Sequence, residues 1–257
     1  MRNWIYFFLA VIFVSCSLHK AAAQQADVVT DSSAVDTTHD YKLKHLIVPA
    51  VLFSYGIVAL ESESLKTLNS DTRDELKQHI DEKLSIDDFT QYSPLAAVFV
   101  LPNLGVKPEH DLGERSIIAG TSFLIMASTV TILKNVSNVE RPDGSSDNSF
   151  PSGHTATAFM GAEMVYQEFK DESIWYGISA YTVAAGTGFF RMYNNRHWLS
   201  DVAMGAGIGI LSTKLSYWLF PEISKLFNKS ESRVLNNMEI SPYADQQQQA
   251  IRVLYRF

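Results

Sequence analysis

Apolar positions gather in six runs along the chain, with polar stretches between them. The six runs cover residues 46–60, 94–106, 116–133, 153–169, 174–190 and 199–220. Between the first two, residues 61–88 carry leucine and isoleucine at helical spacing among charged side chains, which predicts short amphipathic helices. Strand-like alternation is nearly absent before residue 230. The pattern therefore predicts an all-α protein, a bundle of about six core helices.

The last 25 residues follow a different pattern. Residues 233–242 and 250–257 hold alternating or β-branched side chains, and glutamines fill positions 246–249 between them. Two such segments around a polar turn predict a short C-terminal β-hairpin. Earlier in the chain, a run of small residues at 205–209 does not follow a strand, so we interpret Gly205 and Gly209 as sites of close helix packing and not as a nucleotide loop.

Residues 1–23 have the layout of an export signal. Arg2 precedes the apolar residues 4–14, and three alanines at 21–23 offer a cleavage site. A first transmembrane helix is the alternative, although the run is short for a bilayer, and Cys16 loosely matches a lipoprotein cleavage site. We expect an exported protein of the bacterial cell envelope. Its predicted parts are a signal peptide (1–23), a flexible leader (24–41), a helical domain (42–225) and a C-terminal extension (226–257).

The lengths of the apolar runs do not decide whether these helices cross a membrane. They range from 13 to 22 residues, and several fall below the roughly 20 needed to cross a bilayer. If all six crossed, the segments after residues 133 and 190 would face the cytoplasm, which is the wrong side for an exported enzyme. Either one run, such as 94–106, does not cross, or the bundle is periplasmic and soluble or membrane-attached.

The net charge and the cysteine content argue against several classes of partner and site. The formal net charge is −7, which argues against a nucleic-acid partner bound through its phosphates. The single cysteine excludes an intrachain disulfide framework and a cysteine-based metal site. Any anion site must therefore be a local cluster of basic groups.

Polar and basic groups that suit an anion lie in three stretches, each next to the start or the end of a predicted helix. Lys134 ends the run 116–133, and Arg141 lies seven residues further on. Ser152 precedes the next run as a predicted N-cap, which leaves the free amides of the first helical turn available to an anion. Gly153 lets an anion approach the backbone closely, and His154 lies in the same first turn.

The third group pairs a histidine with a carboxylate. Arg191 ends the run 174–190, and His197 precedes Asp201 by one helical turn. A carboxylate at this spacing can accept a hydrogen bond from one ring nitrogen and leave the other as a nucleophile. Each group taken alone also fits an ordinary cap or ion pair. Together, at one end of an antiparallel bundle, they predict a site that grips and attacks a phosphate.

These three motifs are similar to those of the type 2 phosphatidic acid phosphatase superfamily. In the first motif, six residues separate Lys134 from Arg141-Pro142, and the second motif is Pro151-Ser152-Gly153-His154. In the third motif, five residues separate Arg191 from His197, and three separate His197 from Asp201. That superfamily includes bacterial acid phosphatases, lipid phosphatases and vanadium haloperoxidases. Residues 194–198 resemble exported members from Bacteroides-type bacteria. The resemblance implies that phosphate is bound by Lys134, Arg141, Ser152, Gly153 and Arg191.

The resemblance also implies the catalytic roles. His197, oriented by Asp201, attacks phosphorus to form a phosphohistidine, and His154 gives a proton to the leaving alcohol. We expect no metal and no cofactor, and we find no clustered acidic metal site in the sequence. The expected substrate is a phosphate monoester or diphosphate, with a lipid phosphate favoured by the apolar helices, and we expect association with a membrane. The alternatives are a vanadate-dependent haloperoxidase and a non-catalytic structural protein of the envelope.

Overall fold

The computed structural model describes residues 43–78, 85–245 and 248–255. The predicted signal peptide and flexible leader lie outside the described residues. Eight α-helices make up the body of the described chain, which confirms the all-α fold. Their bounds are α2 Ile47–Val58, α3 Glu63–Lys77, α4 Asp87–Thr90, α5 Ser93–Val100, α6 Leu112–Ser137, α7 Gly153–Phe169, α8 Ile174–Tyr193 and α9 Leu199–Asn237. Two 3₁₀ turns, η1 Leu43–Leu46 and η2 Leu101–Leu104, precede α2 and follow α5.

Helix starts and ends follow the local chemistry of the chain. Asp111 caps α6 with a capping box, since its side chain accepts from the Glu114 N–H while the Glu114 side chain accepts from the Asp111 N–H. Gly105 ends η2 with φ +89°, a left-handed conformation that glycine adopts without a steric cost. The helical part of the apolar run 94–106 therefore ends at residue 104, as one short helix followed by a 3₁₀ turn.

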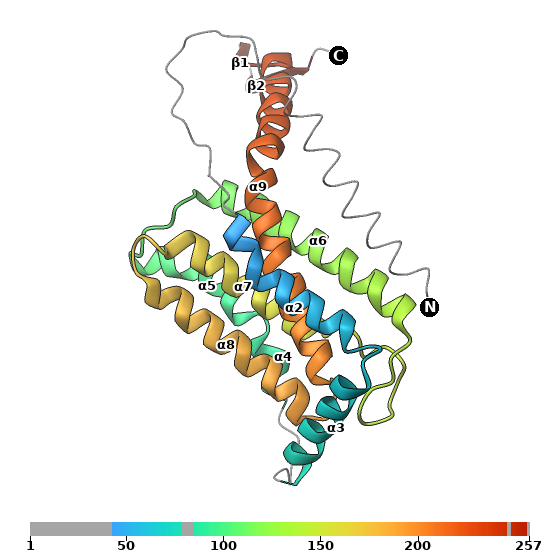
Figure 1. Ribbon diagram of the computed structural model, residues 1–257. Coiled ribbons are helices and arrows are strands. Elements are labelled where there is room, and N and C mark those ends of the chain that lie inside the picture. Colours follow the sequence, from blue (N-terminus) through green and yellow to red (C-terminus); the bar gives the residue numbers. More distant parts are fainter. Residues whose placement is uncertain (1–42, 79–84, 246–247, 256–257) are drawn as a thin grey trace, which may run out of the picture. The chain divides into compact units, whose positions relative to one another are not determined.

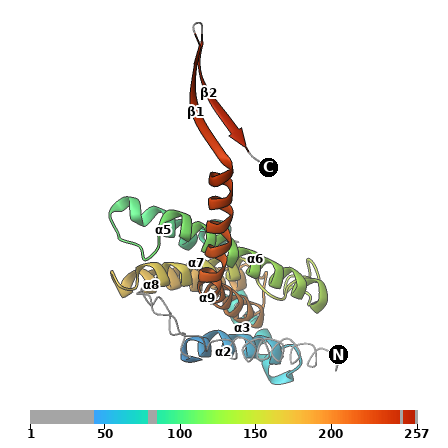
Figure 2. The same ribbon diagram turned by 90° about the horizontal axis from the view of Figure 1, so that it is seen from above.

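Helix α7 is the most buried element of the described bundle. It packs against α5, α6, α8 and α9, which surround it in both views (Figures 1 and 2). The hydrophobic core gathers around this helix. Its buried members are Val98, Ile118, Ala158, Ala162, Met164, Val165, Phe169, Ala180, Ala184 and Tyr217. Packing against four helices keeps the first turn of α7 in a fixed place relative to its neighbours.

Helices α7 and α9 approach each other through glycine. A Cβ added at Gly205 would lie 2.4 Å from the carbonyl oxygen of Ser152, and one added at Gly209 would lie 2.3 Å from that of Ala156. No side chain fits at these distances, so the backbones touch directly. This confirms the interpretation of these glycines as packing positions, and it brings Ser152 against the first turns of α9.

The end of α9 lies beyond the predicted boundary. The sequence pattern predicts that the helix ends near residue 220 and that a strand begins at residue 233, but α9 continues past Pro221 to Asn237. Residues 233–237 are therefore helical. Strands β1 (Met238–Asp245) and β2 (Gln248–Tyr255) follow and pair antiparallel, with Met238 opposite Tyr255.

One helix of the described chain could cross a bilayer by length and composition alone. This is α6, which has 26 residues. In its most apolar stretch of 18 residues, only 28% is buried. A second span exists only if α2 and α3, which meet at a bend of 96°, are counted as one. Large apolar side chains are exposed on several helices, among them Leu124 on α6 and Trp175 on α8, at 67% and 69%.

Candidate active site

The three predicted motifs meet at the N-terminal end of α7. The N–H of Ser152 donates to the carbonyl oxygen of Asp201 at 3.0 Å, which joins the start of α7 to the first turn of α9. The last turn of α8 brings Arg191 to the same region, where Arg191 and His154 both contact the short helix α4. Residues of the motifs that lie up to 67 positions apart in the sequence therefore share one site.

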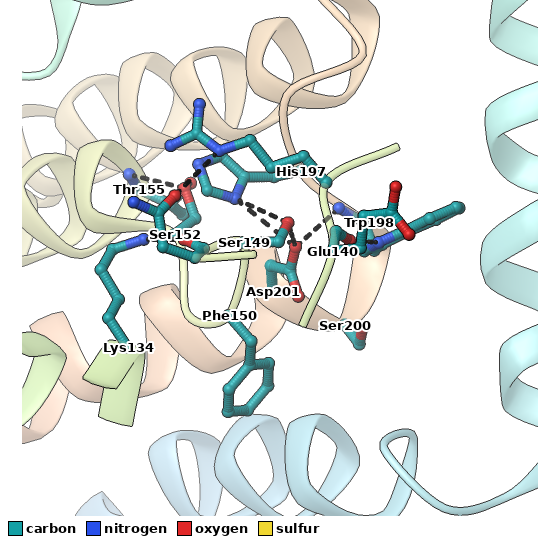
Figure 3. Close-up of polar contacts among 12 residues, drawn as sticks. Lys134, Glu140, Ser149, Phe150, Ser152, Thr155, His197, Trp198, Ser200 and Asp201 are labelled. Carbon is teal, nitrogen blue, oxygen red and sulfur yellow. Dashed lines mark hydrogen bonds and ion pairs between the residues drawn. The ribbon is translucent and has the colours of Figure 1, made fainter. Parts of the chain in front are cut away.

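His197 and Asp201 form a buried pair with a third member, Ser149. The Nδ1 atom of His197 lies 3.4 Å from Oδ2 of Asp201 and 3.5 Å from Oγ of Ser149. Ser149 Oγ in turn donates to the same Asp201 oxygen at 2.5 Å (Figure 3). The backbone N–H of Trp198 also donates to it, at 2.9 Å. These donors hold the carboxylate in place, and the carboxylate holds the Nδ1 edge of the imidazole.

Burial keeps the His197 imidazole neutral. The residue is 3% exposed, and burial lowers its pKa to about 4 even though the hydrogen bond to Asp201 raises it. The positive charges of Arg191 and Lys134 lower this pKa further. In a neutral ring with its Nδ1–H turned to a carboxylate, the second nitrogen, Nε2, carries the free lone pair. The arrangement predicted from the i, i+4 spacing is therefore present in the structure.

Arg191 lies in a buried ion pair that the sequence does not predict. Its Nη1 contacts Oδ2 of Asp87 at 2.5 Å, and the other oxygen of Asp87 accepts from Nδ2 of Asn194 at 2.9 Å. Both charged residues are nearly inaccessible, with Asp87 1% and Arg191 7% exposed. The Nε atom of Arg191 is buried without a hydrogen-bond partner in the described part of the chain. This N–H is available to an oxygen of a bound anion.

His154 contacts the neighbouring carboxylate. Its Nε2 lies 3.0 Å from Oδ1 of Asp88, and the histidine side chain is 29% exposed. Burial and the charge of Arg191 lower the pKa of His154, while Asp88 and then Asp87 act in the opposite direction. The structure therefore places this second predicted catalytic histidine near Arg191, at the more open side of the site.

Lys134 and Arg141 both contact one residue of the loop before α7. Lys134 Nζ donates to the backbone oxygen of Asn148 at 2.6 Å, and Arg141 Nε donates to its side-chain oxygen at 3.2 Å. Burial, reinforced by the charge of Arg141, lowers the pKa of Lys134 to about 8. Asn148 thus gathers two of the three predicted phosphate-binding cations, a support that the sequence motifs do not indicate.

Ser152 and Gly153 begin α7 as predicted. Ser152 is the N-cap, and its Oγ accepts from the N–H of Thr155 at 3.4 Å and shares a hydrogen bond of 2.9 Å with the Thr155 hydroxyl. A Cβ added at Gly153 would meet nothing closer than Val130, at 3.8 Å. Because no protein atom requires a glycine there, the space above its backbone is available to a ligand.

Helix α3 supports the site from the outside. Arg73 donates to the backbone oxygen of Pro142 at 2.8 Å and to the side chain of Asn195 at 3.1 Å. Asn69 exchanges hydrogen bonds with Ser200, at 3.0 and 3.1 Å. These contacts tie the loop after Arg141 and the start of α9 to the same helix, more than 65 positions earlier in the sequence.

An acidic cluster that the sequence does not reveal lies at the site. Among the described residues, ligand-type atoms of Asp87, Asp88 and His154 lie within 4.8 Å of one another. The sequence does not reveal this cluster because the two aspartates lie 66 or more positions before the histidine. Both oxygens of Asp87 already accept from Arg191 and Asn194, so we assign these residues to ion pairs and not to a cation site.

Comparison with known proteins agrees with these motifs. The profile of the PAP2 superfamily matches residues 115–225. A lipid A 1-phosphatase of Porphyromonas gingivalis is 41% identical over 135 residues, which are 52% of this chain and 30% of that protein. The bacitracin transport permease protein BcrC of Bacillus licheniformis is 32% identical over 95 residues, 35% of this chain and 45% of that protein. This chain therefore matches less than half the length of either curated relative.

Two solved structures are also similar. A transmembrane PAP2 type phosphatidylglycerolphosphate phosphatase from Bacillus subtilis covers 68% of this chain and 96% of its own, with a TM-score of 0.43 and 19% identity. LpxE of Aquifex aeolicus covers 70% and 98%, with a TM-score of 0.39 and 20% identity. The family profile includes all three motifs, from Lys134 to Asp201. Residues 115–225 of this chain are therefore a PAP2 superfamily domain.

Proposed function

We propose that this chain is a phosphatase that hydrolyses a phosphate ester through a phosphohistidine, without a metal ion. The observation that carries the proposal is the buried, neutral His197, whose Nδ1 faces Asp201 and Ser149. A nucleophile oriented in this way needs no deprotonation before it attacks. No other histidine of the described chain combines such burial with a carboxylate one turn away.

In the first half of the reaction, Nε2 of His197 attacks phosphorus. A P–N bond forms, the bond from phosphorus to the ester oxygen breaks, and His154 donates a proton to that oxygen. The positive charge that develops on the His197 ring is stabilised by Asp201, which accepts from Nδ1. The products of this half-reaction are the free alcohol and a phosphorylated His197.

In the second half, water attacks the phosphorylated His197. His154 is now neutral and takes a proton from that water, the P–N bond breaks, and inorganic phosphate leaves. The two halves return both histidines to their starting protonation states.

The phosphate oxygens are held by three cations and one helix end. Lys134, Arg141 and Arg191 offset the charge of the transferred group, and the unpartnered Nε of Arg191 gains an acceptor when phosphate binds. The backbone N–H groups that follow Ser152 in the first turn of α7 complete the cradle, with Gly153 allowing close approach. Positive charge already present at the site performs the role that a metal ion has in other phosphatases.

Two observations support a lipid phosphate as the substrate. The P. gingivalis relative is named a lipid A 1-phosphatase, and it is 41% identical over a region of 135 residues. Exposed apolar side chains on α6 and α8 fit contact with a membrane. We propose that the protein is exported and associates with the membrane of the cell envelope, where it acts on a phosphorylated lipid.

Phosphate release from a panel of substrates tests this function. The purified protein, with and without detergent, is given lipid phosphates, lipid diphosphates and soluble phosphate esters, each in the presence of EDTA. We expect release of inorganic phosphate, fastest from a lipid phosphate, and the same rate with and without EDTA. A strict requirement for magnesium would contradict the cradle of three cations, and no release from any substrate would contradict the function itself.

The pH dependence of kcat/KM is expected to be bell-shaped with an acidic optimum. His197 must be neutral to attack, so activity rises as the pH passes its pKa of about 4. His154 must be protonated to serve as acid, so activity falls as the pH passes its pKa, which lies below the ordinary value of 6.5. Initial rates measured between about pH 3 and 9 should therefore peak between these two values. A maximum in alkaline solution would contradict the assigned protonation states.

A further inference from the structure

The short helix α4 is attached to α8 at both of its ends. Asp87 at its start forms the buried ion pair with Arg191, at 2.5 Å, and also accepts from Asn194. Thr90 at its end shares a hydrogen bond of 2.9 Å with Thr187, one turn of α8 before Arg191. These contacts fix the position and the rotation of α4 relative to the C-terminal half of α8.

Asp88 therefore has a defined place at the site. It follows Asp87 directly, and its Oδ1 lies 3.0 Å from Nε2 of His154 and 4.0 Å from Nη1 of Arg191. In contrast to Asp87, its side chain is 57% exposed, so it lies at the open side of the cluster. A leaving group that departs past His154 would pass close to this carboxylate.

We propose that Asp88 is a positioning residue that holds His154 for proton delivery to the leaving group. This inference rests on the proposed phosphatase function. A protonated imidazole has two N–H groups. Asp88 accepts from the one on Nε2, which leaves the one on Nδ1 for the ester oxygen. After the transfer, the neutral ring keeps its Nε2–H on Asp88 and has Nδ1 free to accept a proton from water.

The charges around His154 give Asp88 its importance. From α8, Arg191 lowers the pKa of His154, and burial lowers it as well. From α4, Asp88 and Asp87 oppose this, but Asp87 is already engaged by Arg191 and Asn194. Asp88 is therefore the group best placed to favour a proton on a histidine that lies near a guanidinium. The same negative charge disfavours a leaving group that is itself anionic, so the geometry favours monoesters over diphosphates.

The test compares Asp88→Asn on two substrates that differ in their need for an acid. An alkyl phosphate releases a poor leaving group, which needs the proton, whereas 4-nitrophenyl phosphate releases a phenolate that is stable without one. Because general acid catalysis contributes about 10²- to 10⁴-fold, we expect kcat/KM to fall by about 10-fold or more for the alkyl phosphate and by less than about 3-fold for the aryl phosphate. The alkaline limb of the pH profile should move to lower pH.

Matched variants separate this role from simpler effects. Asp147→Asn removes the same charge from an exposed position in the loop before α7 and should leave both rates and the pH limb unchanged. Asp88→Glu keeps the carboxylate and should restore part of the alkyl phosphate activity. Equal losses on both substrates, or an unchanged alkaline limb, would show a merely structural role and overturn the inference. Absence of turnover by the unmodified protein would overturn the proposed function, and this inference with it.

Discussion

Replacing His197 with alanine should lower phosphate release by a factor on the order of 10⁴ or more, because the variant lacks the atom that attacks phosphorus. The cations of the cradle would remain and still bind phosphate, so the loss should fall on kcat more than on KM. Steady-state rates with the best substrate of the panel, compared with the unmodified protein, measure the effect. Turnover within about 10-fold of the unmodified protein would exclude His197 as the nucleophile.

Two controls show whether such a loss is chemical. His197→Asn keeps a polar group beside Asp201, so its thermal unfolding midpoint should stay close to that of the unmodified protein while activity is lost. Acid lability of a trapped phosphoprotein gives direct evidence, since a phosphohistidine is hydrolysed in acid whereas a phosphoserine is stable there. The unmodified protein should yield an acid-labile phosphoprotein and His197→Asn should yield none. An acid-stable adduct would instead point to Ser149 or Ser152.

The sequence predicts the parts of the fold and the site that local chemistry determines. The mainly apolar run 153–169 coincides with the observed bounds of α7, because a helix buried on nearly all sides is hydrophobic around most of its circumference. Residue type and position predict Ser152 as an N-cap, and the structure shows the hydrogen bond. The pairing of His197 with Asp201 follows from one turn of helix, and it too is present. Each of these features depends on residues within four positions of one another or within a single helix.

The supports of the site could not be predicted, because each is a contact between distant parts of the chain. Ser149 reaches Asp201 across 52 positions, and Asp87 reaches Arg191 across 104. Residues 85–88 read as the end of an amphipathic stretch, where aspartates are ordinarily solvated. Only the packing of α4 on α8 shows that Asp87 is buried. The extent of α9 is underestimated for a different reason. The apolar run ends at residue 220, directly before Pro221, a residue type that ordinarily breaks a helix, whereas α9 continues past it.

Removing the charge of Arg191 should cost both stability and activity. In Arg191→Met, the carboxylate of Asp87 stays buried without its cation, which typically costs about 3–5 kcal/mol. For a chain of this size we expect the thermal unfolding midpoint to fall by about 10 °C. Loss of one donor to the developing phosphate charge should lower kcat by about 10²- to 10³-fold. Differential scanning calorimetry and steady-state rates measure the two effects.

The double variant Asp87→Asn, Arg191→Met separates these two roles. With both charges gone, no buried carboxylate is left unpaired, and the amide oxygen introduced at position 87 can still accept from Asn194. Stability should therefore return to within about 1 kcal/mol of the unmodified protein. Activity should stay low, because the guanidinium that grips phosphate is still absent. Recovery of activity together with stability would mean that Arg191 acts only as a counter-ion for Asp87. Stability restored without activity would show that one guanidinium both anchors α4 and binds the phosphate, so the support of His154 and the grip on the substrate depend on the same side chain.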